Sequence, residues 1–182
     1  MRFARLWAIA FAFSAAAGSP LAIAQPAATP ARVPSQQAAD LNGRTLNVPA
    51  DLGTRPALWL IAFEREQQRE VDRLFALVAP LQKADPALQV WEIPVIEDPG
   101  SVVRFFIDNG MKNGIPSTTT RGRVVTLYVA SRTAWLRTTG LPSAKESIAA
   151  VVAPDGRIMG WRMQSEIADQ AALRALIETT RR

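Results

Sequence analysis

Ala57-Leu-Trp-Leu-Ile-Ala-Phe63 passes directly into Glu64-Arg-Glu-Gln-Gln-Arg-Glu-Val-Asp-Arg73. The first seven residues are all apolar, a pattern typical of a strand that is buried on both faces of a parallel sheet. The charged stretch opens an amphipathic helix, because apolar residues then recur at spacings of three and four, at Val71, Leu74, Phe75 and Val78. The sequence therefore predicts a central strand joined to a long helix, which Pro80 should kink or end near Ala79.

Further elements are predicted on both sides of this pair. A peripheral hairpin or edge strand is expected at residues 41–48, around the turn dipeptide Asn42-Gly43. A second strand is expected at residues 88–93, closed by Pro94. A helix follows in which Asp98 caps, Pro99 takes the first position and Gly110 marks the end.

The C-terminal third predicts a strand, a short helix, a hairpin and a closing helix. β-Branched residues mark the strand at residues 123–129, and Gly140 with Pro142 ends the helix at residues 133–139. Strands at residues 148–153 and 157–162 flank the turn Pro154-Asp-Gly156. The closing helix begins near Ile167 and turns three apolar side chains inward, those of Leu173, Leu176 and Ile177.

In this element order, residues 58–63 with the long helix, and residues 148–161 with the turn at Pro154, resemble the two halves of a thioredoxin-like domain. The resemblance implies an α/β sandwich whose central mixed sheet of about five strands is flanked by helices, with an inserted strand and helix before the final hairpin. Active members carry their redox cysteines where the first buried strand meets the long helix, because the helix N-terminus stabilises a thiolate. Here that junction has no cysteine, and Glu146-Ser147-Ile148 stands where the superfamily places a cis-proline.

A narrower resemblance rests on Phe63-Glu-Arg-Glu-Gln-Gln68, on Val71-Asp72 and on the predicted strand and helix at residues 123–141. These segments are similar to the peroxiredoxin-like family that includes the mitochondrial ATP synthase assembly factor. Function in that family is non-catalytic, so this resemblance implies a protein that holds or places another protein. Fold by itself does not establish such a function.

The composition excludes several chemistries, because the 182 residues contain no cysteine and no histidine. These two residue types supply thiolate nucleophiles, most soft metal ligands and the side chain whose ordinary pKa is nearest neutrality. Thiol–disulfide exchange, thiol-based peroxide reduction, haem attachment through cysteine, zinc binding and histidine acid–base catalysis are all closed to this chain. We therefore expect a non-enzymatic protein with no cofactor and no metal site.

The N-terminus predicts export. Residues 1–24 have the organisation of a secretory signal peptide, with Arg2 and Arg5 before a short apolar run and small residues ahead of a cleavage point after Ala24. A membrane anchor is the alternative, but the apolar run is too short and is broken by Ser14 and Gly18. Residues 25–39, rich in Pro, Ala and Gln, are expected to be a tether, and residues 40–182 one domain. The expected location is the periplasm, without stable membrane insertion after cleavage.

The charge pattern does not favour nucleic-acid binding. The net charge is +5, and removal of residues 1–24 takes away two arginines and no acids, which lowers it to +3. The positive charges are scattered along the chain instead of clustering with aromatic residues. The densest group, Arg121-Gly-Arg123 with Lys112, is interpreted as a solvated loop.

The candidate binding residues follow the two predicted central strands, since open α/β sheets bind ligands at the carboxyl ends of their strands. After the first strand they are Glu64, Arg65, Glu66, Gln67 and Gln68, and after the second Glu97 and Asp98. The alternative interpretation is an exposed first helical turn whose acids suit the helix dipole. The hydroxyl-rich loop Ser117-Thr-Thr-Thr120 is a second candidate, for an anion, and a flexible polar loop is its alternative.

These observations lead to one expected function and one alternative. The expected function is that of an exported, non-redox thioredoxin-like protein that binds a protein or peptide partner during assembly or folding of an envelope complex. The alternative is a small-molecule binder or a carboxylate-dependent hydrolase that uses the acids near Glu64 and Glu97.

Overall fold

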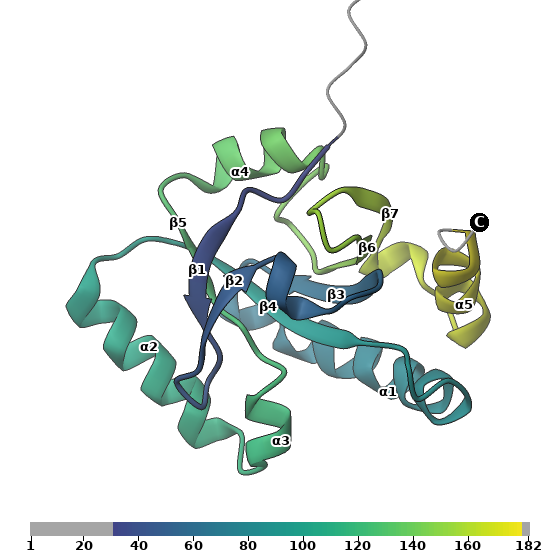
Figure 1. The fold of residues 1–182 in the computed structure, drawn as a ribbon, viewed down its shortest axis with the longest axis horizontal. Coiled ribbons are helices and arrows are strands. Elements are labelled where there is room, and N and C mark those ends of the chain that lie inside the picture. The colour runs from purple at the N-terminus through teal and green to yellow at the C-terminus, as the bar shows by residue number, and fades with distance from the viewer. Residues whose placement is uncertain (1–30, 180–182) are drawn as a thin grey trace, which may run out of the picture.

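A computed structural model of the chain describes residues 31–179 and contains a mixed five-stranded sheet (Figure 1). The strand order is β5-β4-β3-β6-β7. β3 pairs in parallel with β4 and β4 with β5, whereas β6 runs antiparallel to both β3 and β7. The strands are β3 (Ala57–Ala62), β4 (Val90–Glu97), β5 (Leu127–Val129), β6 (Ile148–Val152) and β7 (Ile158–Met163).

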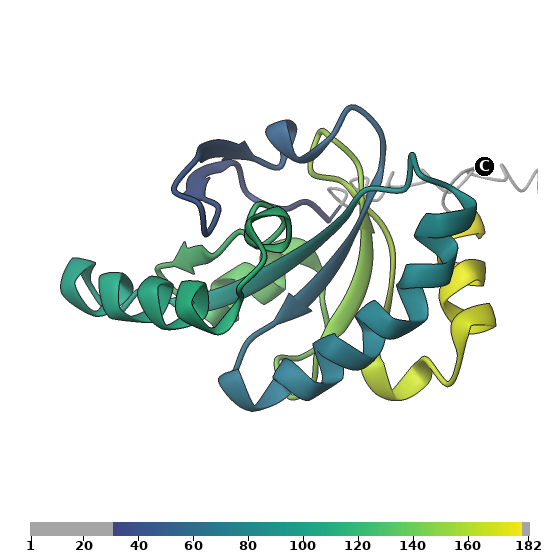
Figure 2. The ribbon, with the colours of Figure 1, turned by 90° about the horizontal axis from the view of Figure 1, so that it is seen from below.

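Each face of the sheet has its own cover. Helices α1 (Gln68–Ala84) and α5 (Gln170–Thr179) pack side by side on one face (Figure 2). The other face is covered by the hairpin of β1 (Gln36–Ala39) and β2 (Thr45–Val48), by the 3₁₀ turn η1 (Ala50–Leu52) and by α4 (Arg132–Thr139). The arrangement confirms the predicted thioredoxin-like α/β sandwich with a central mixed sheet.

Strand β3 lies at the centre of the sheet, as its apolar run predicts. All six of its residues are buried, and they alternate between the two cores. Leu58 and Leu60 pack under α1 and α5, whereas Trp59 and Ile61 pack under the hairpin and α4. A continuous apolar run is needed here because neither face of this strand meets water.

Two prolines lie inside their elements. Pro80, predicted to kink or end the long helix near Ala79, does not end it, and Pro94 does not close the second strand. Helix α1 continues through Pro80 to Ala84, because the stripe of buried residues at Val71, Leu74 and Val78 continues to Leu81 while Pro80 itself faces solvent. Strand β4 likewise continues through Pro94 to Glu97. Its ladder with β3 ends at Pro94 and its ladder with β5 begins at Val95, so the missing N–H lies where one ladder passes into the next.

The N-terminal hairpin forms around the predicted turn, but its first strand begins earlier than expected. β1 spans Gln36–Ala39, inside the segment assigned to the tether, and pairs with β2 in antiparallel register. Even Val33 is buried, with its N–H bonded to the carbonyl of Gly156. A Pro- and Ala-rich composition did not reveal β1, because this segment lacks the alternating apolar pattern of a strand. The predicted signal peptide at residues 1–24 lies outside the described residues.

The C-terminal part agrees with the sequence except at the element ends. Ser131 caps α4 by accepting the N–H of Ala134, and Gly140 ends the helix at a φ of 65°. β6 and β7 form the predicted hairpin, but α5 begins at Gln170 instead of near Ile167. The strand predicted at residues 123–129 is regular only over its last three residues, with isolated bridges at Val124 and Val125. No helix among residues 31–179 has the length and apolarity to cross a bilayer.

The carboxyl group of Glu92 is buried against the sheet. Glu92 on β4 is 5 % exposed and pairs with Leu60 of β3, on the face that α1 covers. Burial raises the pKa of Glu92 from 4.5 to about 6, an effect that the side chain of Gln68 opposes and the charge of Asp72 increases. The folded protein therefore holds this proton at pH values where the unfolded chain has already lost it.

Replacement of this acid tests the cost of the buried charge. As the pH rises from 4.5 to 6 the wild-type protein loses about 2 kcal/mol of unfolding free energy through Glu92, and the loss persists at higher pH. Relative to wild type, Glu92→Gln should gain about 2 kcal/mol between pH 4 and pH 7.5, measured by urea unfolding at both pH values. The control is Glu97→Gln, at the exposed end of the same strand. A Glu92→Gln difference that is equal at both pH values would contradict the assignment.

Candidate functional site

The junction between β3 and α1 is built around the amide side chain of Gln67. A 3₁₀ turn, η2 (Arg65–Gln67), connects the two elements and turns this side chain inward, where it is 5 % exposed. Its Oε1 atom accepts the N–H of Phe63 at 2.8 Å, and its Nε2 atom donates to the carbonyl of Ala144 at 2.8 Å. Gln67 therefore ties the end of the central strand to the segment that leads into β6.

The other four predicted residues of this junction are exposed. Glu64 forms an ion pair with Arg132 at the start of α4, and Gln68 donates to Asp72 one turn along α1 at 3.1 Å. Arg65 and Glu66 point to solvent. The structure therefore places the five predicted residues at one end of the sheet. Gln67 is buried and bonds to the backbone, whereas the other four side chains are on the surface, where a partner can reach them.

A second feature of this region is the residue before β6. Ser147 is fully buried, its N–H donates to Oε2 of Glu70 at 2.7 Å and its carbonyl accepts the N–H of Gln164 at 2.9 Å. Its hydroxyl has no hydrogen-bond partner among the described residues. The backbone that the superfamily fixes with a cis-proline is thus held here by Glu70 of α1.

Asp98, one of the two predicted acids that follow β4, contacts only nearby residues of its own segment. Asp98 accepts the N–H of Gly100 at 2.9 Å and forms an ion pair with Arg104. These contacts, led by the hydrogen bond from Arg104, hold the pKa of the Asp98 carboxyl below its usual value. A carboxyl kept deprotonated in this way is poorly suited to act as a general acid. Asp98 lies ahead of helix α2 (Ser101–Gly114), which begins two residues later than predicted and ends four residues beyond Gly110.

The half-buried side of helix α2, which faces the domain, carries Arg104, Ile107, Asp108 and Met111, and the opposite side is apolar and exposed. The hydroxyl of Tyr128 on β5 donates to Asp108 at 2.8 Å, and the guanidinium of Arg104 lies 4.8 Å from the centroid of the same ring. Burial, with the nearby Asp108, raises the pKa of Tyr128. The opposite side exposes four large apolar side chains, those of Val102 (70 %), Val103 (46 %), Phe105 (65 %) and Phe106 (67 %).

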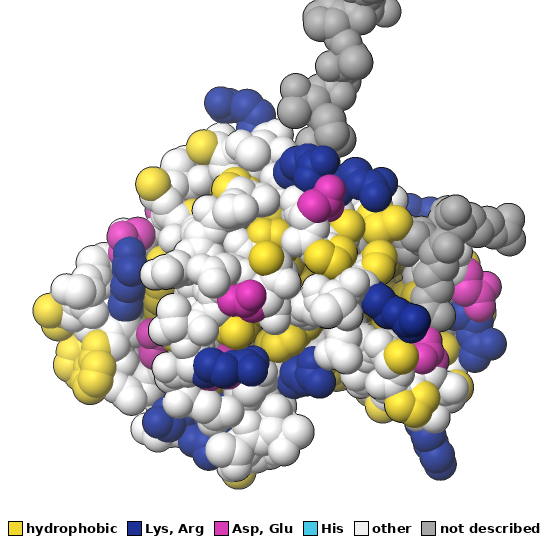
Figure 3. Space-filling view, viewed as in Figure 1, with side chains coloured by type: hydrophobic (Ala, Val, Ile, Leu, Met, Phe, Trp, Pro, Cys, Tyr) yellow, Lys and Arg dark blue, Asp and Glu magenta, His cyan; other side chains and the backbone are white. Residues whose placement is uncertain are grey.

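This apolar face of α2, which comprises Val102, Val103, Phe105 and Phe106, was not predicted as a surface. The sequence pattern shows that these residues share one part of the helix, but it does not show which side of the helix meets the sheet. Figure 3 shows the corresponding hydrophobic atoms at the left edge of the molecule, over α2. Exposed apolar patches of this kind mark interaction sites in many proteins.

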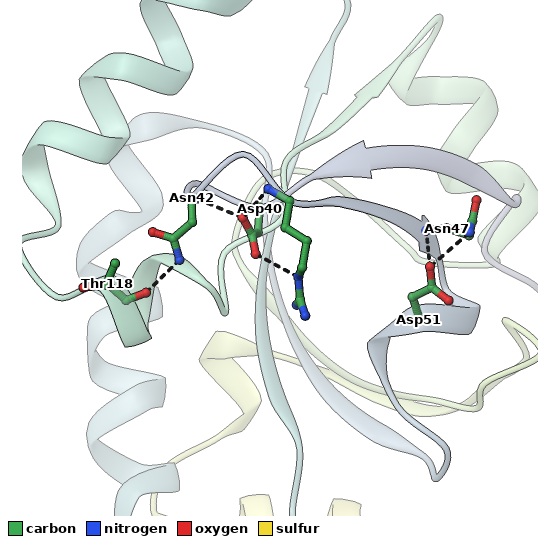
Figure 4. A network of polar contacts seen from close by, with 6 residues as sticks. Asp40, Asn42, Asn47, Asp51 and Thr118 are labelled. Atoms are coloured by element: carbon green, nitrogen blue, oxygen red, sulfur yellow. Dashed lines mark hydrogen bonds and ion pairs between the residues drawn. The ribbon is translucent and has the colours of Figure 1, made fainter.

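A cavity of about 830 Å³ lies at the amino ends of β3 and β4, opposite the junction with α1. It is bordered by the β1–β2 turn, by the segment between η1 and β3, and by the short helix α3 (Thr118–Arg121) (Figure 4). Thr118 and Thr119 of the predicted hydroxyl-rich loop contribute to its wall, as do Arg44, Arg55 and Arg123. The candidate residues predicted from the sequence follow the carboxyl ends of the strands, whereas this cavity lies at the amino ends. The sequence did not reveal it because its walls come from segments that are distant in sequence.

The comparisons with known proteins support the fold. No protein-family model and no curated protein matches the chain. BsSco, a member of the Sco family of cytochrome c oxidase assembly proteins, superimposes with a TM-score of 0.55 at 14 % identity, covering 83 % of this chain and 94 % of that one. Arabidopsis thaliana ScoI with copper bound gives a TM-score of 0.54 at 10 % identity, with coverages of 83 % and 99 %.

A third similar structure is a putative thiol:disulfide interchange protein DsbE from Chlorobium tepidum. Its TM-score is 0.51 at 11 % identity, and the match covers 83 % of this chain and 96 % of that one. At such identities the likeness concerns the fold, and the narrower resemblance to the ATP synthase assembly factor family stays a hypothesis. The chain therefore has a thioredoxin-like α/β fold in which no cysteine is available for thiol chemistry.

The two hydrogen bonds of Gln67 give a stability prediction. Gln67→Ala leaves the buried N–H of Phe63 and the carbonyl of Ala144 without their partner, which should lower the unfolding free energy by about 2 kcal/mol or more in chemical denaturation. Glu66→Ala, one residue earlier and exposed, is the matched control and should change it by less than about 0.5 kcal/mol. Equal losses in the two variants would show that the amide does not hold the junction.

Proposed function

We propose that this chain is an exported, non-redox thioredoxin-like protein that binds a partner protein during assembly or folding of an envelope complex, and that the apolar face of α2 is its contact surface. The observation that carries the proposal is the exposure of four large apolar side chains on one helix of a domain whose other apolar residues fill two cores. Water penalises such a face by roughly 25 cal/mol per Å² of apolar area. A partner that covers it removes this penalty.

The polar contacts of α2 show that the exposure is built into the fold. Arg104 bonds to Asp98 and stacks on Tyr128, while Asp108 accepts the Tyr128 hydroxyl. These groups fix the rotation of the helix about its own axis, so the apolar side cannot turn inward without breaking them. Phe105 and Phe106 contact each other edge to face, with ring centroids 5.8 Å apart, and form a compact aromatic anchor.

The size of the face favours a partner that surrounds the helix. Four side chains expose on the order of 400 Å² in total, about half of what each subunit buries in a stable dimer of standard size. Two copies meeting through flat α2 faces would therefore associate weakly. A partner with an apolar groove would contact the helix on three sides, in the manner of helix-in-groove recognition with anchors at neighbouring positions. The occupant that we propose is such a groove on another protein.

Two further considerations support an assembly role. Structures of the same fold include proteins whose names describe cytochrome c oxidase assembly and thiol:disulfide interchange. The absence of cysteine from this chain removes the second activity while leaving the scaffold. The exposed residues at the start of α1, Glu64, Arg65, Glu66 and Gln68, form a second contact surface in this proposal, as the sequence led us to expect.

Removal of the aromatic anchor should abolish partner capture. The tagged mature protein is used as bait for detergent-solubilised envelope proteins of the source cells, with Phe105→Ser/Phe106→Ser as the test variant. Since buried aromatic anchors commonly contribute about 2 kcal/mol or more each, partners held by the wild type should be recovered at least about tenfold less. Both side chains are exposed, so the thermal midpoint should not fall. An unchanged set of captured proteins would contradict the proposal.

Two parallel measurements identify the occupant. Light scattering of the wild type should give a monomer over a wide range of concentrations, and vesicles of phosphatidylglycerol and phosphatidylcholine should not retain it. Self-association or vesicle binding that depends on Phe105 and Phe106 would contradict a partner protein.

The start of α1 is tested separately with Arg65→Ala/Glu66→Ala, which leaves the buried Gln67 intact. If this surface also contacts the partner, the variant should reduce capture of the same proteins by about threefold to tenfold, because exposed polar contacts contribute less than buried aromatic anchors. The readout is the recovery of each partner at equal bait concentration. Full recovery would remove the start of α1 from the contact surface and leave the α2 face as the proposed site.

A further inference from the structure

The cavity at the amino ends of β3 and β4 collects positive charge that the fold does not neutralise. Three arginines contribute to its wall, Arg44, Arg55 and Arg123, together with two aspartates, Asp40 and Asp51. The cavity lies at the opposite end of the sheet from Gln67 and is independent of the α2 face. Its volume of about 830 Å³ lies in the range of ordinary small-molecule sites.

Both aspartates are occupied by groups of the protein itself. Asp40 accepts the N–H groups of Asn42 and Arg44, at 2.9 and 3.0 Å, and pairs with the Arg44 side chain at 3.3 Å. Asp51 accepts the backbone N–H of Asn47 at 2.7 Å and its side-chain amide at 3.0 Å. These contacts stabilise the β1–β2 hairpin and its link to η1 (Figure 4). Neither aspartate forms an ion pair with Arg55 or Arg123, although Oδ1 of Asp51 keeps the capacity to accept a further hydrogen bond.

Arg55 and Arg123 have no carboxylate partner among the described residues. Arg123 is held in place by a hydrogen bond to Oε1 of Gln89 and by its stacking on Trp91, 5.0 Å from the ring centroid. Both contacts leave most of its five N–H donors free. A guanidinium that is positioned by neutral groups in a cavity is the usual arrangement for binding an oxyanion.

The opposite wall adds neutral donors. The segment predicted as a hydroxyl-rich loop forms the short helix α3, which carries Thr118 and Thr119. The carbonyl of Thr118 accepts a hydrogen bond from Nδ2 of Asn42 at 2.9 Å, and the two hydroxyls are exposed. Gly122 allows this close approach, because a Cβ atom there would lie 3.2 Å from the same Asn42 nitrogen. The loop and the hairpin turn are thereby fixed against each other, with two hydroxyls on the cavity wall.

We propose that this cavity binds the phosphoryl group of a phosphate ester, with Arg55 and Arg123 as the charged contacts and Thr118 and Thr119 as neutral donors. Two guanidinium forks and two hydroxyls offer more donors than the two oxygens of a carboxylate accept, and they suit the three terminal oxygens of a phosphate monoester. The cavity is larger than a phosphate ion, so it accommodates the esterified group as well. A soluble ester and a phospholipid headgroup share this chemistry.

Titration of the mature protein with glycerol 3-phosphate by calorimetry, at low and at physiological salt, tests the proposal. Arg55→Ala should weaken binding about tenfold and Arg55→Ala/Arg123→Gln about a hundredfold, because each removes a charge-assisted contact. Arg69→Ala/Arg137→Gln removes the same net charge from exposed positions outside the cavity and is the control. Arg55 is exposed and forms no ion pair with any residue in 31–179, so its replacement should preserve the thermal midpoint.

Vesicles of phosphatidylcholine with and without phosphatidic acid separate the two sources of the phosphoryl group. Retention by phosphatidic acid vesicles that Arg55→Ala abolishes identifies a lipid headgroup, and binding of glycerol 3-phosphate alone identifies a soluble ester. The proposal is overturned if neither probe binds, if the Arg55 and control variants lose affinity equally, or if succinate binds more tightly than the phosphate ester. Phe105→Ser/Phe106→Ser should bind glycerol 3-phosphate like the wild type, because neither phenylalanine lines the cavity. Phosphate-ester binding is therefore tested independently of the proposed partner binding.

Discussion

Burial of β3 on both of its faces is the constraint on which the other parts of the fold depend. Trp59 and Ile61 need a cover on one side of the sheet, and Leu58 and Leu60 need one on the other. The N-terminal hairpin with α4 covers Trp59 and Ile61, and α1 with α5 covers Leu58 and Leu60. Since a single strand cannot exclude water by itself, its six buried residues require two layers of other segments.

The junction after β3 shows how the scaffold persists without thiols. A buried amide, that of Gln67, bonds to the backbone of Phe63 at the end of β3 and of Ala144 ahead of β6, and Glu70 fixes the residue before β6. Neutral and charge-assisted hydrogen bonds thus stabilise the junction between β3 and α1 and the start of β6. The exposed neighbours, Arg65 and Glu66, are free of such structural contacts and form an ordinary polar surface.

The apolar face of α2 and the arginine-lined cavity both lie outside the two hydrophobic cores that cover the sheet. In α2 an Arg104–Asp98 pair and the Tyr128 hydroxyl fix the polar side inward and leave the apolar side in water. In the cavity, the aspartates stabilise the hairpin and form no ion pair with Arg55 or Arg123. Both surfaces carry a local free-energy cost in the isolated domain, which a bound partner or ligand would remove.

Much of the fold could be predicted from local patterns. The apolar run of β3, the stripe from Val71 to Val78 and the Gly140 end of α4 each depend on neighbouring residues, and each appears in the structure as expected. Pro80 and Pro94 do not end their elements for one reason. Each removes a single backbone N–H, and the buried residues on both sides of it continue the helix or strand past that position.

The sequence by itself determined the chemistry that is closed to this protein, since a chain without cysteine or histidine has no thiolate and no imidazole in any conformation. It also determined the central strand and the helix that follows, because hydrophobic periodicity is a local property. Only the tertiary structure decided that Gln67 is buried, that α2 exposes its apolar side and that Arg55 lies in the same cavity as Thr118. Hydrophobic periodicity predicts which residues share a face of a helix or strand. Contacts between segments distant in sequence decide whether that face packs against the sheet or is exposed to solvent.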